Sequence, residues 1–340
     1  MVSLRGSAPA ATVALSALGT ATARPPAWKA GADHPQAGAF VTVDGTRLHY
    51  LEMGTGIPVV LLHGNGSMIA DFVSSGIVER AAASCRVIAF DRPGFGHSER
   101  PSSRLWTPVE QASLLLKAFA LLGIERPIIV GHSWGTLVAL ALALKGSGQV
   151  AGLVLLSGYY YPTPRSDTLA IAQVAAMLNP FMRGAMAAGA IRRVFAPLAV
   201  PERFRRAYSI ALALRPSQIR AVREETAMLI DAAAALSRRY AELNIPVGII
   251  AGSEDRIVET DKHSARLHEQ LRASTFRRVP GSGHMVHHAA PDEVVTAIAA
   301  VGEARQRTAR SPAKPCKALQ RRWLHIGDNA MEHRLELATT

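Results

Sequence analysis

The residues best suited to chemistry begin with a serine in a turn between a strand and a helix. Ser133 is the central residue of Gly131-His132-Ser133-Trp134-Gly135, which directly follows the apolar run Ile128–Val130 and precedes a helix-length apolar segment. A serine on such a turn projects its Oγ from the sheet, and the flanking glycines let the chain turn without a clash of Cβ atoms. The helix N-terminus also favours negative charge developing nearby. The pattern therefore predicts Ser133 as a nucleophile.

A histidine and an aspartate in two later loops supply what this serine needs. A serine hydroxyl is a poor nucleophile unless a base takes its proton and an acid orients that base. His284 ends the Gly-rich loop 280–284, and Asp255 follows the apolar run Val247–Ala251, so both loops should open at the same edge of the sheet as Ser133. We therefore predict His284 as the general base and Asp255 as the orienting acid. Glu254 is the neighbouring alternative, but successive side chains in an extended segment point in opposite directions.

Short apolar runs separated by helix-length segments predict how these loops are positioned. Two runs on either side of the turn Asp44-Gly45 are expected to form an antiparallel hairpin. The later Val-, Ile- and Leu-rich runs alternate with helices, which is typical of a mainly parallel sheet covered on both faces. We therefore predict an α/β fold with a doubly wound parallel sheet and an antiparallel hairpin at one edge. The predicted strands are Phe40–Val43, Arg47–Glu52, Val59–Leu62, Val87–Phe90, Ile128–Val130, Leu153–Leu156, Val247–Ala251 and Thr275–Val279, and the predicted helices include Pro108–Leu122, Gly135–Leu144 and Ser264–Leu271.

The alternation of strands and helices stops between residues 162 and 243, where helical patterning continues without a convincing strand. We expect this segment to form a helical cap over the carboxyl ends of the strands, where open α/β sheets bind their ligands. Residues 38–161 and 244–302 then form the core. Residues 303–340 are basic and lack a clear pattern, so we expect a disordered tail.

The first 37 residues form a leader with the outline of an export signal. Arg5 precedes a modestly apolar stretch, and Ala21-Thr22-Ala23 provides a small-x-small cleavage pattern. Thr12 and Ser16 interrupt the apolar stretch, so a disordered, alanine-rich leader is the alternative. We accordingly expect either an exported protein, periplasmic or extracellular, or a cytoplasmic one.

Taken together, these motifs resemble those of the α/β-hydrolase family, and more closely its serine hydrolases with a helical lid. The resemblance covers nearly the whole ordered part of the chain, from Phe40 to Gly302. The matching motifs are His63-Gly64-Asn65-Gly66, Asp91-Arg92-Pro93-Gly94-Phe95-Gly96-His97-Ser98, the serine turn, and the Asp255 and His284 loops.

The resemblance implies the same roles for the three residues already singled out. It further implies an oxyanion hole made by the backbone N–H groups of Trp134 and Asn65, and the assignment of Asn65 rests on the resemblance alone. The same pattern gives Asp91 the role of holding its own Gly-rich turn. His63, His97 and His132 lie beside glycines and are interpreted as hydrogen-bonding residues that fix their loops.

The chemical type of the nucleophile separates this chain from some relatives of the same fold. Haloalkane dehalogenases and epoxide hydrolases resemble it in the loop after the third strand, and Asn65 with Trp134 is similar to a halide site, but those enzymes attack with a carboxylate. A serine that attacks an alkyl group forms an ether, which water does not readily cleave, whereas an acyl-serine hydrolyses readily. The sequence therefore predicts a serine hydrolase for a carboxylic ester, or a related acyl bond, of a small and partly apolar substrate.

Three other functions remain open on the sequence. A carbon–carbon bond hydrolase and a cofactor-free perhydrolase would use the same three residues. A ligand-binding receptor that keeps a hydrolase fold belongs to a different class. Binding alone does not require Ser133, Asp255 and His284 together, so their presence favours an enzyme.

Apolar side chains in or near the predicted cap are candidates for contact with the small-molecule substrate. They are Tyr159, Tyr160, Met177 and Phe181, and packing of the cap against the core is the alternative reading for each. Residues 163–243 also hold twelve arginines and six acidic residues, half of the net charge of +12. This excess favours anionic substrates or association with an acidic membrane surface, with an exposed arginine-rich helix face as the alternative.

Composition and spacing argue against several other partners. No reading motif for nucleic acid accompanies the basic residues. His287 and His288 follow His284 with a spacing suggestive of a metal site, but the sequence shows neither an acidic partner nor a second ligand-rich segment. Cys85 and Cys316 lack metal-ligand spacing. We therefore expect no metal and no cofactor.

Overall fold

A computed structural model of the protein describes residues 38–146, 148–163 and 183–310. The predicted leader, residues 1–37, lies outside these ranges. So do Met177 and Phe181 and the end of the predicted tail, from residue 311 onward. In the described part of the chain, no helix is both long and apolar enough to cross a membrane.

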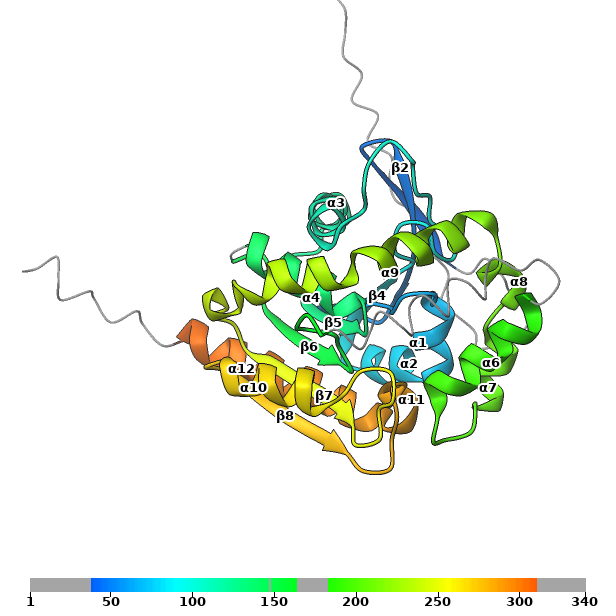
Figure 1. Cartoon of the computed structure of the whole chain (residues 1–340). Helices are drawn as coiled ribbons and strands as arrows, with labels where there is room; N and C mark the ends of the chain where they lie inside the picture. The colour runs from blue at the N-terminus through cyan, green and yellow to red at the C-terminus, as the bar shows by residue number, and fades with distance from the viewer. Residues whose placement is uncertain (1–37, 147, 164–182, 311–340) are drawn as a thin grey trace, which may run out of the picture.

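The core is an eight-stranded sheet in the order β1-β2-β4-β3-β5-β6-β7-β8 (Figure 1). All neighbours from β4 to β8 run parallel, whereas β2 pairs antiparallel with both β1 and β4. This arrangement confirms the predicted fold class and the antiparallel hairpin at one edge. The strands are β1 Ala39–Val43, β2 Thr46–Met53, β3 Ile57–Leu62, β4 Cys85–Phe90, β5 Ile128–His132, β6 Gly152–Leu156, β7 Val247–Gly252 and β8 Ser274–Val279.

Local sequence explains the ends and the centre of the sheet. Asp44 and Gly45 both have positive φ, 47° and 74°, which is the geometry of a two-residue turn between twisted antiparallel strands. Strand β5 is buried at all five positions because helices cover both faces of the sheet. Strand β8, at the opposite end of the sheet from the hairpin, instead alternates between half-buried and exposed residues and carries Arg277 and Arg278.

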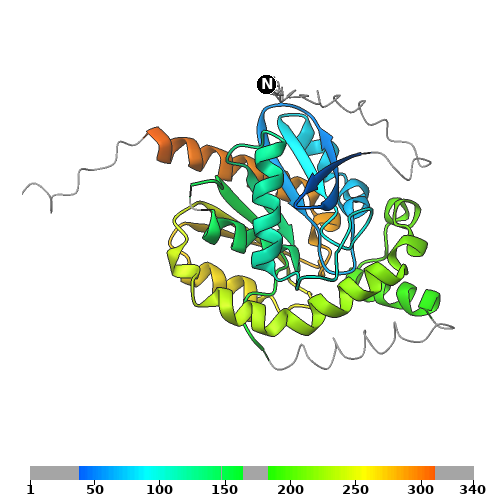
Figure 2. The same ribbon diagram turned by 90° about the horizontal axis from the view of Figure 1, so that it is seen from above.

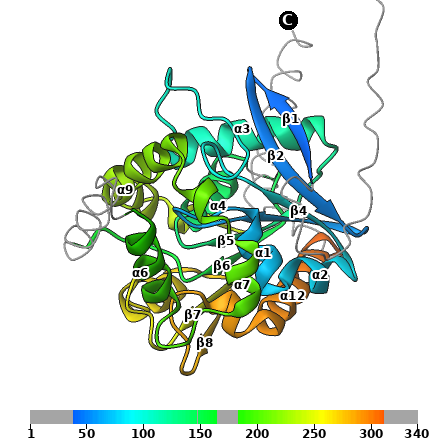
Figure 3. The same ribbon diagram turned by 90° about the vertical axis from the view of Figure 1, so that its right-hand side faces the viewer.

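Helices cover the two faces of the sheet (Figure 3). On one face, α3 (Pro108–Leu121) and α4 (Gly135–Lys145) pack against side chains such as Leu62 and Ile129. On the other face, α1 (Ile69–Ser75), α2 (Ile77–Ala82) and α12 (Pro291–Arg310) pack against side chains such as Leu61 and Val130. Successive residues of each strand thus enter different cores, which fixes the register of the sheet.

The strands β6 and β7 are separated by an insertion whose described part is helical. It contains α6 Arg183–Phe195, α7 Glu202–Ala207, α8 Ile210–Ala213, α9 Pro216–Ser237 and the short turn η1 Tyr240–Glu242. We call α6 to α9 the insertion helices. Helix α9 runs along one side of the molecule, with α6 and α7 beyond one of its ends (Figure 2). Helix α9 packs against α4 and α7 packs against α1, so the insertion bridges elements from both faces.

Two further helical elements connect the last strands. The turn η2 (Asp261–Ala265) and α10 (Arg266–Gln270) join β7 to β8, and α11 (Val286–Ala289) follows β8.

The first residues of the segment expected to be a disordered tail, 303–310, are helical. Helix α12 continues to Arg310, so the predicted boundary falls inside a helix. The apolar side of the helix is buried through Ile298 and Val301, and the following charged residues form exposed turns in which Glu303 and Arg307 pair at 3.7 Å. A polar, basic composition did not distinguish these exposed final turns from a disordered segment.

Candidate active site

Ser133 lies at the tip of a closely packed turn between β5 and α4. Its φ is 51°, a conformation that residues with a side chain seldom adopt. Two hydrogen bonds hold it there, from Ser133 N–H to Leu156 O at 2.8 Å and from Thr136 Oγ1 to Ser133 O at 2.6 Å. A Cβ at Gly135 would collide with the carbonyl oxygens of Leu62 and His63, so glycine is required by this close approach. The surrounding structure thus maintains a locally strained serine.

The structure brings the three predicted side chains together. His284 Nε2 lies 2.9 Å from Ser133 Oγ, and His284 Nδ1 lies 2.8 Å from Asp255 Oδ2. The other oxygen of Asp255 accepts the backbone N–H groups of Ile257 and Val258, at 2.8 and 2.9 Å. An ionised carboxylate only accepts, so His284 donates from Nδ1 and leaves Nε2 to accept the serine proton. Glu254, the alternative acid, is exposed, whereas Asp255 is buried.

The two residues implied for the oxyanion hole share one feature. Among the described residues, no hydrogen bond occupies the backbone N–H of Asn65 or that of Trp134, which is what donors to an oxyanion require. Their side chains, by contrast, are engaged with α9. Asn65 Nδ2 donates to Thr226 Oγ1 at 3.0 Å and to Val222 O at 3.3 Å, and Trp134 Nε1 donates to Glu225 O at 3.1 Å.

The Gly-rich turn after β4 is held as the resemblance implied. Asp91 Oδ2 accepts the N–H of His97 at 2.9 Å and lies 2.7 Å from His49 Nδ1, while Oδ1 accepts the N–H of Ile69 at 2.8 Å. Burial by itself would raise the pKa of Asp91, but the hydrogen bond and charge of His49 outweigh it and lower that pKa. The carboxylate therefore stays ionised and joins three separate segments.

A second group of histidines and an aspartate lies next to the candidate triad. Asp71 Oδ1 is 3.0 Å from His287 Nε2 and 2.7 Å from His288 Nε2, and Asp71 Oδ2 accepts Ser67 Oγ at 2.9 Å. The ring of His132 lies between, with centroids 4.3 Å from His287 and 5.0 Å from His284. We call Asp71, His287 and His288 the second aspartate–histidine group. Asp71 is the acidic partner that the sequence did not show, because it is separated from His287 by 216 residues.

Burial sets the protonation of this second group. It lowers the pKa values of His132 and His287, so both rings are neutral. For Asp71 burial acts in the raising direction, but the neighbouring His287 and His288 hold its pKa well below the ordinary value. Ligand atoms of Asp71, His132 and His287 lie within 4.8 Å of one another, so the sequence-based reason for expecting no metal does not hold. Within this cluster, Asp71 is hydrogen-bonded to His287 Nε2, whereas His132 Nε2 lies 3.1 Å from His284 O.

The structure places Tyr159 and Tyr160 in the packed loop after β6. Tyr160 has no exposed surface, and its backbone N–H donates to His263 Nδ1 at 3.1 Å. The ring of Tyr159 lies 4.4 Å from that of His263, and its hydroxyl bonds to Thr163. Both side chains are buried and packed in this loop, and their contact with substrate stays a prediction.

Aromatic residues of the insertion helices pack near His284 instead. Phe195 and Phe204 lie edge-on to the ring of His288, with centroids 5.0 and 5.5 Å away, and both belong to an apolar cluster with Met285, which follows His284. A Cβ at Gly283 would collide with the carbonyl oxygen of Ala196. The insertion therefore rests directly on the loop that carries His284.

Comparison with known proteins agrees with this fold. A model of the α/β-hydrolase family matches residues 59–297, well over half of the chain. The protein therefore belongs to the α/β-hydrolase family.

Individual relatives have diverse activities. Haloalkane dehalogenase 2 of Mycobacterium tuberculosis is 28% identical over 265 residues, which are 74% of this chain and 90% of the relative. The 2-hydroxymuconate semialdehyde hydrolase of Pseudomonas putida is 34% identical over 122 residues, 36% of this chain and 43% of the relative. A solved esterase of Exiguobacterium antarcticum superimposes with a TM-score of 0.67 at 22% identity, covering 78% of this chain and 99% of that one. The last likeness shows the fold alone.

Proposed function

We propose that the protein is a serine hydrolase that cleaves a carboxylic ester, or a related acyl bond, through an acyl-serine intermediate. The observation that carries the proposal is the chain of hydrogen bonds from Asp255 through His284 to Ser133. The order acid–histidine–serine, the tautomer of His284 and the burial of Asp255 and His284 are those that turn a serine hydroxyl into a nucleophile. The family supports a hydrolase, and the serine supports acyl chemistry in particular.

The proposed reaction uses each group in turn. His284 Nε2 takes the proton of Ser133 as Oγ attacks the substrate carbonyl, and the resulting oxyanion is bound by the amides of Asn65 and Trp134. The protonated His284 then gives its proton to the leaving alcohol, which releases the product and leaves an acyl-serine. Water attacks this acyl group with His284 again as the base, the bond between the acyl carbon and Ser133 Oγ breaks to release the acid, and His284 returns the proton to Oγ. Asp255 holds the tautomer and stabilises the imidazolium in both halves.

Two features weigh against halide chemistry despite the relative named haloalkane dehalogenase 2. The turn carries a serine, and an alkyl-serine ether would not be hydrolysed. In addition, Asn65 and Trp134 are the pair that resembles a halide site. Their side-chain N–H groups already donate hydrogen bonds to residues of α9, so they are not available to bind an anion.

A fluorophosphonate probe tests this proposal directly, because it phosphonylates an activated serine. We expect the wild-type protein to be labelled and to hydrolyse a short activated ester, and Ser133→Ala to lose labelling and about a millionfold in kcat. Ser157→Ala is a matched control, since Ser157 also has positive φ (46°) and is buried but lies after β6, outside the hydrogen-bonded triad. Labelling that persists in Ser133→Ala would contradict the proposal. An unlabelled wild-type protein would instead favour a receptor.

Cleavage of a carbon–carbon bond is the second candidate. It is supported by the likeness to 2-hydroxymuconate semialdehyde hydrolase, and it would use the same three residues. A panel that sets short-chain esters against a vinylogous diketone ring-cleavage product separates the two. A ratio of kcat/KM in favour of the ester supports our first choice.

A further inference from the structure

A fully buried arginine lies behind the candidate oxyanion hole. Arg92 follows Asp91 at the end of β4, and its side chain has no exposed surface. An arginine offers five N–H donors in a fixed planar fork, and all five have acceptors here. Nε donates to His63 O at 2.7 Å, Nη2 to Gly64 O at 3.0 Å, and Nη1 to Gln111 Oε1 at 3.1 Å, while Nη1 and Nη2 each also donate to Glu225. These contacts leave the guanidinium one orientation.

The bond to Gly64 acts on the peptide that carries the candidate oxyanion donor. The carbonyl of Gly64 and the N–H of Asn65 belong to one planar trans peptide and point in opposite directions. Gly64 O also accepts from His63 Nδ1 at 2.8 Å, while His63 Nε2 accepts the backbone N–H of Arg92 at 2.9 Å. Burial and the charge of Arg92 lower the pKa of His63 to about 3, so the ring is neutral with its proton on Nδ1. The N–H of Ser67 also donates to Gly64 O, at 3.3 Å, so two short side-chain hydrogen bonds and a longer backbone one set the direction of the Asn65 N–H.

Glu225 completes this arrangement from the insertion. It lies on α9, has a fully buried side chain, and accepts from Arg92 and from Gln111 Nε2 at 3.0 Å. Its backbone carbonyl accepts the indole N–H of Trp134, the other candidate donor residue. One residue of the insertion thus contacts Trp134 through its main chain and, through its side chain, the arginine that holds the Gly64–Asn65 peptide.

Burying the ion pair of Arg92 and Glu225 costs desolvation free energy, and this cost makes a purely structural role a poor explanation. Desolvation of two charges offsets most of their attraction, so an apolar pair of similar volume would pack and stabilise about as well. An apolar pair could not, however, hold the carbonyls of His63 and Gly64. What the ion pair adds is the orientation of a peptide.

We propose that Arg92, fixed by Glu225, is a positioning residue that directs the Asn65 N–H at the oxyanion of the reaction. This inference rests on the proposed function, because it needs an oxyanion at that place. It makes helix α9 of the insertion a part of the catalytic machinery and not only a cover. A misdirected donor weakens binding of the oxyanion more than binding of the substrate, so the effect falls on kcat.

The test compares two buried arginines that both pair with α9. Arg92→Lys keeps the charge but cannot reach His63 O, Gly64 O and Glu225 together. Arg100→Lys is the matched control, because Arg100 is equally buried and bonds to Glu224 of the same helix. Its Nη1 donates to Pro93 O and lies 3.9 Å from Glu225 Oε1, so this variant changes the same buried charge network without touching a carbonyl of the oxyanion loop. The readouts are kcat and KM for a short activated ester and the Ki of a trifluoromethyl ketone. This ketone reacts with the serine and forms an adduct that carries an oxyanion. In that reaction, Ser133 Oγ bonds to the carbonyl carbon, the π electron pair of the carbonyl moves to its oxygen, and His284 takes the proton of the serine.

We expect Arg92→Lys to lower kcat by about tenfold to a hundredfold with little change in KM. For Arg92→Lys, the Ki of the ketone should rise by the same factor as kcat falls. For Arg100→Lys, both kcat and the Ki of the ketone should stay close to the wild-type values. If Arg92→Lys folds poorly, the double variant Arg92→Met with Glu225→Leu removes the charges together and is expected to keep the fold. It should show the same loss of kcat and the same weakening of the ketone.

Distinct outcomes separate this inference from the proposed function. A wild-type protein that neither reacts with a fluorophosphonate nor hydrolyses any acyl substrate would overturn both. An active wild-type protein whose Arg92→Lys variant behaves as Arg100→Lys does, or changes only in KM, would overturn the positioning role alone.

Discussion

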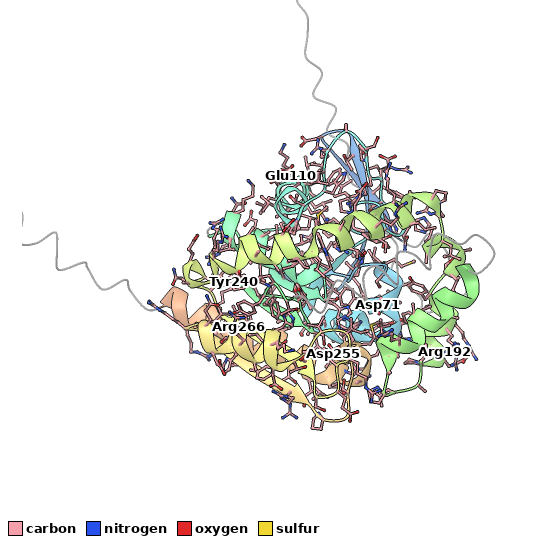
Figure 4. The ribbon with its side chains drawn as sticks, viewed as in Figure 1. Asp71, Glu110, Arg192, Tyr240, Asp255 and Arg266 are labelled. Carbon is pink, nitrogen blue, oxygen red and sulfur yellow. The ribbon has the colours of Figure 1, made fainter. Side chains whose placement is uncertain are left out.

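Two aspartate–histidine groups lie on either side of the serine turn, and their difference shows what makes one of them fit for catalysis. In the first group, His284 bonds to Asp255 through Nδ1 and to Ser133 Oγ through Nε2. In the second, His287 and His288 both direct Nε2 at one oxygen of Asp71. Figure 4 labels the two aspartates, Asp71 on α1 and Asp255 after β7. Both groups are buried and both contain a charged carboxylate, so burial and charge do not distinguish them.

What distinguishes the groups is the partner beyond the histidine. His284 connects an acid to the hydroxyl of Ser133, whereas the hydrogen bonds of the second group join its own members and Ser67. The second group joins α1 to α11 and holds His288 against the aromatic residues of the insertion. We therefore assign it to stability and expect substitutions in the two groups to affect different measurements.

The largest effect is expected from the two histidines that carry this contrast. His284→Gln removes the base, and kcat for a short ester should fall on the order of a millionfold. His288→Gln keeps a donor for Asp71 and should retain most of the activity. Steady-state kinetics of the two variants at equal protein concentration measures the difference. Comparable losses in kcat would show that the second group takes part in the chemistry.

The aspartates should separate activity from stability. Asp255→Asn leaves His284 with the wrong tautomer, and kcat should fall about ten-thousandfold with a small change in stability. Asp71→Asn should cost about 1–3 kcal/mol in the free energy of unfolding, because a charged acceptor of two buried rings is lost. Urea denaturation and ester hydrolysis on both variants measure this. The contrast between the groups fails if Asp71→Asn is as inactive as Asp255→Asn.

Ionisation of Asp71 adds a dependence on pH to the same variant. Its pKa in the folded protein lies well below the ordinary value. The carboxylate therefore contributes stability above pH ~4, and this contribution is lost as the pH falls toward the folded pKa. Asp71→Asn should accordingly be less sensitive to acid than the wild type below pH ~4.

A third buried histidine, bonded only to backbone, should give the smallest effect. Burial lowers the pKa of His263 to about 4, while its Nδ1 accepts the N–H groups of Tyr160 and Tyr161. The unfolded chain titrates near pH ~6.5 and binds more protons below that pH, so stability falls as pH drops from ~6.5 toward ~4, by at most about 3 kcal/mol from this residue. His263→Gln keeps an acceptor without a titration. Its unfolding free energy, measured by urea denaturation from pH 7 to pH 4, should therefore depend less on pH, and an unchanged slope would contradict this assignment.

Local patterns and the topology of parallel sheets allowed the fold and the three central residues to be predicted. The serine turn is a contiguous motif, and the Asp255 and His284 loops follow strands whose carboxyl ends share one edge. Those arguments need only chain order and strand type. They do not depend on how any one side chain packs.

The contacts that sequence reasoning missed join residues across the insertion or across the whole core. Arg92 and Glu225 are 133 residues apart, and Asp71 and His287 are 216 apart, so no spacing within the chain relates them. The complete burial of Tyr160 was not predicted for a related reason, because an aromatic side chain after a buried strand has the same pattern whether it faces a ligand or packs under a loop. A charged residue among mainly apolar positions of a helix face, as at Glu225, was an available signal.

Strand β8 has a consequence for the behaviour of the protein in concentrated solution. As the last strand of the sheet it leaves one side of its backbone without a neighbouring strand among the described residues, and such edges can pair with strands of other molecules. Its two adjacent arginines are exposed, and they pair with Glu293 and Asp261 rather than lying in an apolar strip. Charge at this position opposes edge-to-edge association, so the open end of the sheet is protected against aggregation by its own side chains.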